Sequence, residues 1–225
     1  MVEKLKSVLK TPKLRSGAKA LVLALSLYAL PLWVTGALAF LFYFWPVTFS
    51  LGFMGTFISL SIVSAVLFGA APSFITALAA GVVFFLLLGI KNVLFLHRFS
   101  LFLLCLGFIV FSSVWGFFSG LVSLPVLAVM IFLAVRDGLA AFTPFPKKAS
   151  LFAAVSALVV SEMSWAVFYL NIPDHWATVS VILVFIGVIF MTIEYLRGHL
   201  FKSEAPFWAT ALAVVAFAIA IIASF

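Results

Sequence analysis

The longest apolar stretch of the chain covers residues 20–90 and contains no Asp, Glu, Lys, Arg or His. A soluble domain cannot bury seventy-one consecutive residues of this kind, whereas a helix that crosses a bilayer needs about 20 of them. The clearest breaks within the stretch are Trp45-Pro46 and the Gly- and Pro-bearing residues 69–72. Pro31 is expected to kink the first of the resulting helices. The pattern predicts three transmembrane helices, over residues 19–43, 47–68 and 73–90.

Apolar segments continue through the second half of the chain. Residues 99–135 are long enough for two helices that turn around residues 116–123. Residues 136–148 form the longest predicted loop, which the two prolines of Thr143-Pro144-Phe145-Pro146 keep rigid and non-helical. Three further helices are predicted over residues 149–170, 176–195 and 205–225, the first two joined by a turn at residues 171–174. The expected fold is an all-α, polytopic transmembrane bundle of about eight helices, with seven as the alternative.

The N-terminal segment differs from the rest in its charge. Residues 1–18 are expected to form a basic amphipathic tail on the membrane surface, and residues 19–225 a single transmembrane domain. A cleaved signal peptide ending near Ala37-Leu38-Ala39 is disfavoured, because more membrane-grade sequence follows it. Each basic side chain near an anionic leaflet contributes on the order of 1 kcal/mol. The expected headgroup contacts are Lys4, Lys6, Lys10, Lys13, Arg15 and Lys19.

The charges of the connections test the predicted topology. All other Lys and Arg residues fall in residues 91–98, 136–148 and 197–202, and two predicted helices separate each group from the next. These groups therefore share one face, which the positive-inside rule assigns to the cytoplasm. Three helices between the tail and residue 91 would place the equally basic tail on the opposite face. Either the first apolar run contains an even number of passes, with one piece re-entrant or interfacial, or one basic group faces outwards.

The composition agrees with a membrane protein. Hydrophobic residues make up 67% of the chain and charged residues only 8%, against about 25% in soluble domains. The formal net charge of +7 lies in the tail and short loops, which favours anionic lipid over nucleic acid as the partner. The single cysteine, Cys105, allows no internal disulfide. Membrane lipids and other membrane proteins are the expected partners.

Glu162 is the first candidate for a functional residue. It is predicted midway along a transmembrane helix, where an ionisable side chain costs about 2.5–3.5 kcal/mol. Trp165 and Tyr169 follow at i+3 and i+7 on the same face, next to a small-residue face of Ala153, Ala157 and Ser161. The three residues are candidates for binding a substrate, a proton or a cation. The alternative is a protonated, purely structural glutamate hydrogen-bonded between helices.

Other polar residues predict less. Glu194 with Arg197, Arg136 with Asp137, and Asp174 with His175 are typical of helix ends. The three histidines lack the i, i+4 spacing of helical zinc sites, and no nucleotide or nucleophile motif is present, so no metal, cofactor or catalytic residue is predicted. One cluster of hydroxyls lies on a single predicted helix and is expected mainly to bond its own i−4 carbonyls, although it could line a polar path: Thr56, Ser59, Ser61 and Ser64.

Two short stretches resemble a protein family. Gly89-Ile90-Lys91-Asn92 is followed by Phe95 and Arg98, and Glu162-Met163-Ser164-Trp165 is followed by Leu170 and Pro173. Over about twenty positions and in its hydropathy layout, the chain resembles uncharacterised polytopic membrane proteins of small-genome bacteria. The resemblance implies a location in the bacterial plasma membrane and gives weight to Glu162, but it implies no reaction.

Three functions are compatible with these observations. The first is a non-enzymatic membrane component or a subunit of a membrane complex. The second is a small transporter or solute-binding subunit in which Glu162 is the coupling or recognition group. A water-accessible cavity at Glu162 would favour this second function, and a sealed helix interface the first. The third is an intramembrane lipid-modifying enzyme, which would need several convergent polar groups, so the sequence favours a non-enzyme.

Overall fold

The computed structural model describes residues 12–44, 52–117, 123–143, 146–169 and 174–197. Over these ranges the chain forms eight α-helices, α2 to α9, and one 3₁₀ helix, η1, with no strand. The prediction of an all-α helical bundle is therefore confirmed. The predicted helix over residues 205–225 lies outside the described ranges. Three described segments are long and apolar enough to cross a membrane: Phe74–Lys91, Pro125–Phe142 and Ala149–Ala166.

The chain divides into two compact units, Met1–Cys105 (unit 1) and Leu106–Phe225 (unit 2). Helix α6 (Arg98–Phe117) begins in unit 1 and ends in unit 2. The other helices of unit 1 are α2 (Pro12–Ala29), α3 (Leu32–Phe44), α4 (Met54–Ala70) and α5 (Phe74–Lys91). The other elements of unit 2 are α7 (Ser123–Phe142), η1 (Pro146–Lys148), α8 (Ala149–Tyr169) and α9 (Asp174–Arg197).

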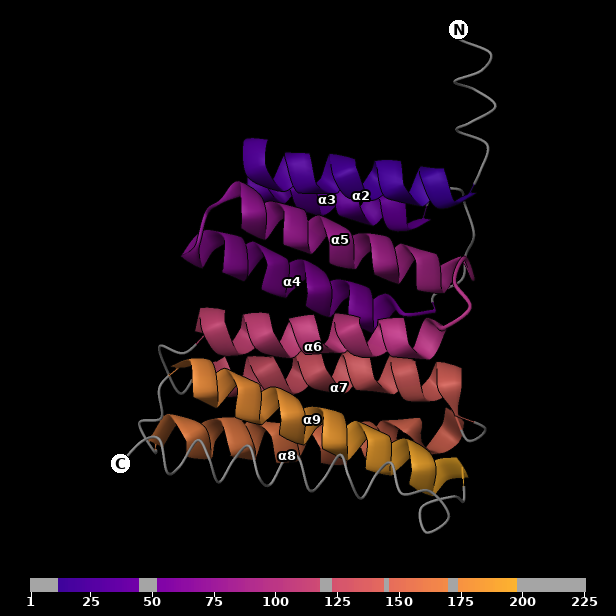
Figure 1. Cartoon of the computed structure of the whole chain (residues 1–225), viewed down its shortest axis with the longest axis vertical. Helices are drawn as coiled ribbons and strands as arrows, with labels where there is room; N and C mark the ends of the chain where they lie inside the picture. The colour runs from indigo at the N-terminus through magenta and orange to yellow at the C-terminus, as the bar shows by residue number, and fades with distance from the viewer. Residues whose placement is uncertain (1–11, 45–51, 118–122, 144–145, 170–173, 198–225) are drawn as a thin grey trace, which may run out of the picture. The chain divides into compact units, whose positions relative to one another are not determined.

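Helices α2 to α5 form a four-helix bundle with an up-and-down order. Each contacts the next along the chain, and α2 and α5 close the ring (Figure 1). Tyr28, near the end of α2, packs edge-on against Phe68 at the end of α4 and Phe74 at the start of α5, with ring centroids 6.5 and 6.0 Å apart. The start of α2 and the end of α5 therefore lie at the same end of the bundle.

Pro31 separates two helices, so the predicted single kinked helix over residues 19–43 is wrong. The Pro31 carbonyl accepts hydrogen bonds from the backbone N–H groups of Val34 and Thr35, which begins α3. The Lys19 ammonium donates to the carbonyl of Phe42 at 3.0 Å. A continuous helix would hold residues 19 and 42 about 35 Å apart, at 1.5 Å per residue. The contact therefore requires α3 to fold back along α2, and the run up to residue 91 contains four helices instead of three.

The closest crossing in unit 1 is between α2 and α5, and small residues make it possible. Ala20 and Ala24 of α2 and Ala77 and Gly81 of α5 are all buried, and the two helices contact each other. A Cβ atom at Gly81 would lie 2.7 Å from the Ala24 Cβ and 3.1 Å from the Ala20 carbonyl oxygen. Small residues at i and i+4 on both helices allow this backbone approach, as in small-xxx-small membrane motifs.

In unit 2, α8 contacts both α7 and α9. The Phe152 ring near the start of α8 lies 5.5 Å from the Tyr195 ring near the end of α9, which makes this pair an antiparallel hairpin, as predicted. The buried stripe of α8 includes two members of the predicted small-residue face, Ala153 and Ala157, while Ser161 is partly exposed. The hydroxyls of Ser156, Ser161 and Ser164 donate to the carbonyls four residues earlier.

Helix α7 continues to Phe142, so the predicted loop over residues 136–148 is too long. Arg136 and Asp137 lie within the helix, and η1 begins at Pro146. Pro144 excludes the helical conformation at Thr143, and it would clash with the carbonyl four residues earlier only if the helix continued through it, so α7 can extend to Phe142. The shorter connection is consistent with the close packing of α7 on α8.

Candidate functional site

Two lysines meet the carboxyl end of α3. The Lys19 ammonium, from α2, donates to the Phe42 carbonyl at 3.0 Å, and the Lys91 ammonium, from the end of α5, donates to the Tyr43 carbonyl at 2.7 Å. The last carbonyls of a helix have no intrahelical partner and carry partial negative charge, so cations stabilise them. The two ammonium groups also repel each other. The α3 terminus therefore holds two like charges close together.

Tyr43 organises this arrangement. Its buried ring lies beneath the Lys91 ammonium, with 3.5 Å between the nitrogen and the ring centroid, which is a cation–π contact. The Tyr43 hydroxyl donates to the Gly52 carbonyl just before α4. Its ring also packs on Phe57 of α4, with centroids 4.5 Å apart. Tyr43 thus connects the ends of α3 and α5 to the start of α4.

The connection between α5 and α6 adds a third cation. Val93 adopts a left-handed conformation, with φ 56°, and the Leu94 N–H donates to the Gly89 carbonyl at 2.8 Å, which together end α5 in a Schellman-type turn. Phe95 then lies against Gly89, where a Cβ atom would be 2.0 Å from its ring. The Arg98 guanidinium donates from Nε to the Ile90 carbonyl at 3.1 Å. Residues 89–98, which carry part of the family resemblance, thus form one locally packed turn.

We call Arg15, Lys19, Lys91 and Arg98 the cationic end of unit 1. Arg15 precedes Lys19 by one helical turn and adds to the repulsion on its ammonium group. In the whole of residues 1–105, Glu3 is the single acid against eight Lys and Arg residues. Lys13 and Arg15 are exposed, and their contact with lipid headgroups stays a prediction. Lys4, Lys6 and Lys10 lie outside the described ranges.

Glu162 lies on the outward face of α8. The residues at helical spacing on this face are exposed: Leu151, Val155, Leu158 and Trp165, the last with 46% of its surface accessible. Glu162 is thirteen residues from the start of α8 and seven from its end, so it lies about two-thirds of the way along the helix. The structure thus brings Glu162 and Trp165 onto one face as predicted. Tyr169 follows on the same helix, but its side chain is not among those described.

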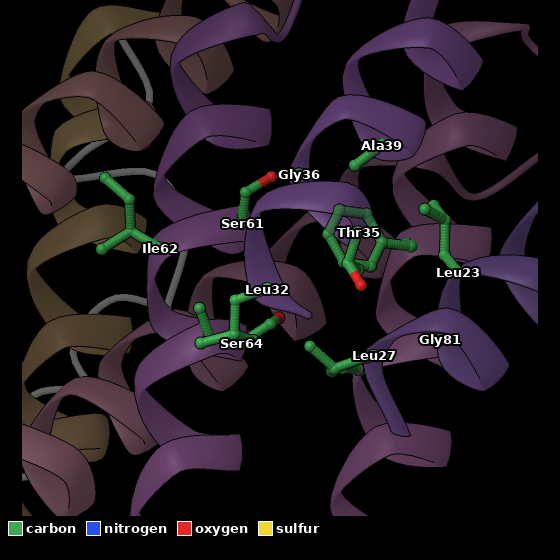
Figure 2. Close-up of a pocket in the computed structure, with 13 residues that line it drawn as sticks. Leu23, Leu27, Leu32, Thr35, Gly36, Ala39, Ser61, Ile62, Ser64 and Gly81 are labelled. Atoms are coloured by element: carbon green, nitrogen blue, oxygen red, sulfur yellow. The ribbon is translucent and has the colours of Figure 1, made fainter. Parts of the chain in front are cut away.

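The predicted hydroxyl cluster of α4 divides into two kinds. The Ser61 hydroxyl donates to the Phe57 carbonyl at 2.9 Å, which is the expected i−4 bond. The Ser64 hydroxyl is buried without a hydrogen-bond partner, and so is the hydroxyl of Thr35 on α3. Figure 2 shows Thr35, Ser61 and Ser64 around one pocket, with Leu23 and Leu27 of α2 also on its wall. Ser64 therefore departs from the expected pattern.

The sequence pattern does not identify Lys91, Tyr43 and Thr35 as site residues. The sequence places Lys91 only in a basic connection, because its contact with α3 depends on the hairpin at Pro31. The sequence places Tyr43 at the end of a transmembrane helix, and Thr35 lies among small and apolar residues. The positive-inside rule could have indicated the site. It conflicts with three helices before residue 91, and an even number of helices would bring Lys19 and Lys91 to the same end.

Comparison with known proteins provides no assignment: no family model, curated protein or solved structure matches the chain.

Proposed function

We propose that the protein is a multi-pass, non-enzymatic component of a bacterial plasma membrane, held with the cationic end of unit 1 against an anionic cytoplasmic leaflet. The observation that carries this proposal is the return of α3 along α2, given by the contact between Lys19 and Phe42. With four helices in the bundle, the start of α2, which bears Lys13, Arg15 and Lys19, and the connection after α5 lie at one end. The positive-inside rule then applies to both without conflict.

The antiparallel packing of α3 along α2 does not require α3 to cross the whole bilayer. Helix α3 has thirteen residues and is therefore about 20 Å long, shorter than the roughly 30 Å of a hydrocarbon core. Its terminal carbonyls would lie below the headgroup layer, where an unsatisfied carbonyl is costly. Lys19 and Lys91 satisfy two of these carbonyls and can still direct N–H groups towards lipid phosphate, since each ammonium has three donors.

Single-cysteine labelling tests the topology. In a Cys105→Ala background, Lys13→Cys, Asn92→Cys and Lys147→Cys should react with a membrane-impermeant maleimide from the same side of sealed membrane vesicles. Ala71→Cys, at the opposite end of unit 1, should react from the other side. Labelling of Lys13→Cys and Asn92→Cys from opposite sides would refute the proposed arrangement.

Lipid retention tests the anchoring. The full chain, extracted from membranes with phosphatidylglycerol and phosphatidylethanolamine, should retain the anionic lipid in native mass spectrometry. The double substitution Lys19→Gln and Lys91→Gln should lower this retention severalfold, whereas Lys147→Gln, an exposed lysine of unit 2, should not. Equal retention of both lipids by the wild type would contradict the role of the cationic end.

The exposed position of Glu162 on α8 supports a role for the protein as a subunit of a membrane complex. A carboxyl group on a lipid-facing surface is costly, and contact with a polar group on another membrane helix would remove most of this cost. The alternative role of Glu162, as a transport coupling group, has a separate test. Glu162→Gln should then abolish proton-linked uptake by reconstituted vesicles, and unchanged uptake would count against transport.

A further inference from the structure

Unit 1 contains a cavity of about 240 Å³ between α2, α3, α4 and α5 (Figure 2). Its walls are mainly apolar and include Leu23, Leu27 and Phe84. A dry cavity of about 150 Å³ already accommodates benzene in a well-studied engineered protein. The cavity in unit 1 is therefore large enough for a molecule with a carbon skeleton longer than one aromatic ring.

Two hydroxyls give the cavity a polar side. Thr35 has 8% and Ser64 has 2% of its surface accessible, and the oxygen of neither has a hydrogen-bond partner. Both residues line the cavity, from two different helices. Serine and threonine in helices ordinarily satisfy themselves by bonding the i−4 carbonyl, as Ser61 does in this same wall. Leaving two buried hydroxyls unsatisfied costs free energy that an oxygen-bearing guest would recover.

The cavity opens to the surface of unit 1 between α3 and α4. Leu32 and Gly36 of α3 and Ile62 of α4 line it and are also exposed. A Cβ atom at Gly36 would meet no atom within 4 Å, so the backbone leaves space there. A guest can therefore enter from the side of the bundle without passing the cationic end.

We infer that this cavity binds a membrane-soluble molecule with an apolar body of about eight carbons and one oxygen, an alcohol or a ketone, whose oxygen bonds Thr35 and Ser64. A hydroxyl can serve both side chains, since it donates one hydrogen bond and accepts others. A ketone accepts from both. This site is separate from Glu162 and from the lipid contacts of the cationic end. Its failure would leave the proposed topology and anchoring untouched.

Photolabelling of the full chain with a diazirine-bearing octanol tests the inference. Mass spectrometry should locate the adducts on lining residues of α2 to α5, and unlabelled octanol should compete. Thr35→Val and Ser64→Ala keep the shape of the wall and should each weaken competition about fivefold, which corresponds to one neutral hydrogen bond. Ser61→Ala is the matched control, since its hydroxyl bonds Phe57, and it should change competition little.

Two further arms separate binding from mere packing. Gly36→Leu, which places a large side chain at the opening of the cavity, should reduce specific labelling strongly while the helix content remains unchanged. A diazirine-bearing octane without oxygen should label the cavity less efficiently than the octanol. Adducts outside the lining residues, equal labelling by the two probes, or competition unaffected by both hydroxyl substitutions would overturn the inference.

Discussion

The two units differ most in how their charges are balanced. Unit 1 contains eight Lys and Arg residues and one acid, whereas unit 2 contains five of each sign, so the whole net charge of +7 belongs to unit 1. The charges of unit 2 sum to zero, whereas unit 1 has a large excess of cations, which is why the proposed contact with an anionic leaflet concerns unit 1. In a membrane, the anions available to the ends of helices are lipid phosphates.

The units also differ in how they use small residues. In unit 1, Gly81 and Ala24 bring two helix backbones together and a cavity remains beside them. In unit 2, α8 presents a buried stripe that includes Ala153, Ser156 and Ala157. The hydroxyl of Ser156 bonds its own helix, but two other buried hydroxyls in the described part of unit 2, Ser112 and Ser180, have no partner. Thr35 and Ser64 differ from these two serines because they line the same cavity.

The largest expected effect comes from widening the α2–α5 crossing. Gly81→Ala should lower the free energy of unfolding by about 2 kcal/mol, because the added Cβ would lie 2.7 Å from the Ala24 Cβ and close to the Ala20 carbonyl. Denaturant titration in mixed micelles measures the change.

Two glycines serve as controls for this crossing. A Cβ atom added at Gly69 in unit 1 or at Gly107 in unit 2 would meet no neighbouring atom within 4 Å. Gly69→Ala and Gly107→Ala should be neutral or raise stability by up to about 1 kcal/mol through helix propensity. An equal loss in all three variants would show that the crossing is not the reason for the effect.

A smaller loss is expected when the α3 terminus loses a cation. Lys91→Met should destabilise the protein by about 1 kcal/mol. The substitution removes a charged hydrogen bond and a cation–π contact. Two factors reduce the loss: the repulsion with Lys19 disappears, and Lys91 is partly exposed to solvent. Lys147→Met, at an exposed position of unit 2, should change the unfolding free energy by less than about 0.5 kcal/mol. Equal changes in both variants would argue against a special role for the cationic end.

The turn after α5 offers a gain of similar size. Val93→Gly should raise stability by about 1 kcal/mol, because a β-branched residue is strained at φ 56° and glycine is not. Val93→Ala keeps the steric penalty of a Cβ atom and should not give this gain. A thermal unfolding series of the three proteins would show whether the order holds.

The smallest effect is expected at the outward face of α8. Glu162→Gln should change the unfolding free energy of the isolated chain by less than about 0.5 kcal/mol, as for most exposed positions. Ala153→Leu, on the buried face of the same helix, should cost about 1–3 kcal/mol by overpacking. A loss above about 2 kcal/mol for Glu162→Gln would show that its carboxyl group supports the fold from within.

Much of the fold follows from hydropathy and turn residues. The predicted helices over residues 73–90 and 149–170 correspond to α5 and α8 within one residue at each end. The ends of α5 at Ser73-Phe74 and Lys91-Asn92, and the start of α8 at Lys148-Ala149, are marked by polar residues that are visible locally. The helix over residues 47–68 was placed less well, since α4 begins at Met54. Phe53, directly before α4, adopts a left-handed conformation, which a phenylalanine does not indicate in the sequence.

What sequence alone determined is a membrane protein made of helices, because apolar length and the need to satisfy backbone groups leave few other solutions. It also placed Glu162 and Trp165 on one helix face, since that depends only on helical periodicity. The tertiary structure decided that Pro31 separates two antiparallel helices, that Lys19 and Lys91 meet at the end of α3, and that Thr35 and Ser64 share a cavity. The two lysine hydrogen bonds join residues 23 and 48 positions apart, and a local pattern contains no information on which way a chain turns after a proline.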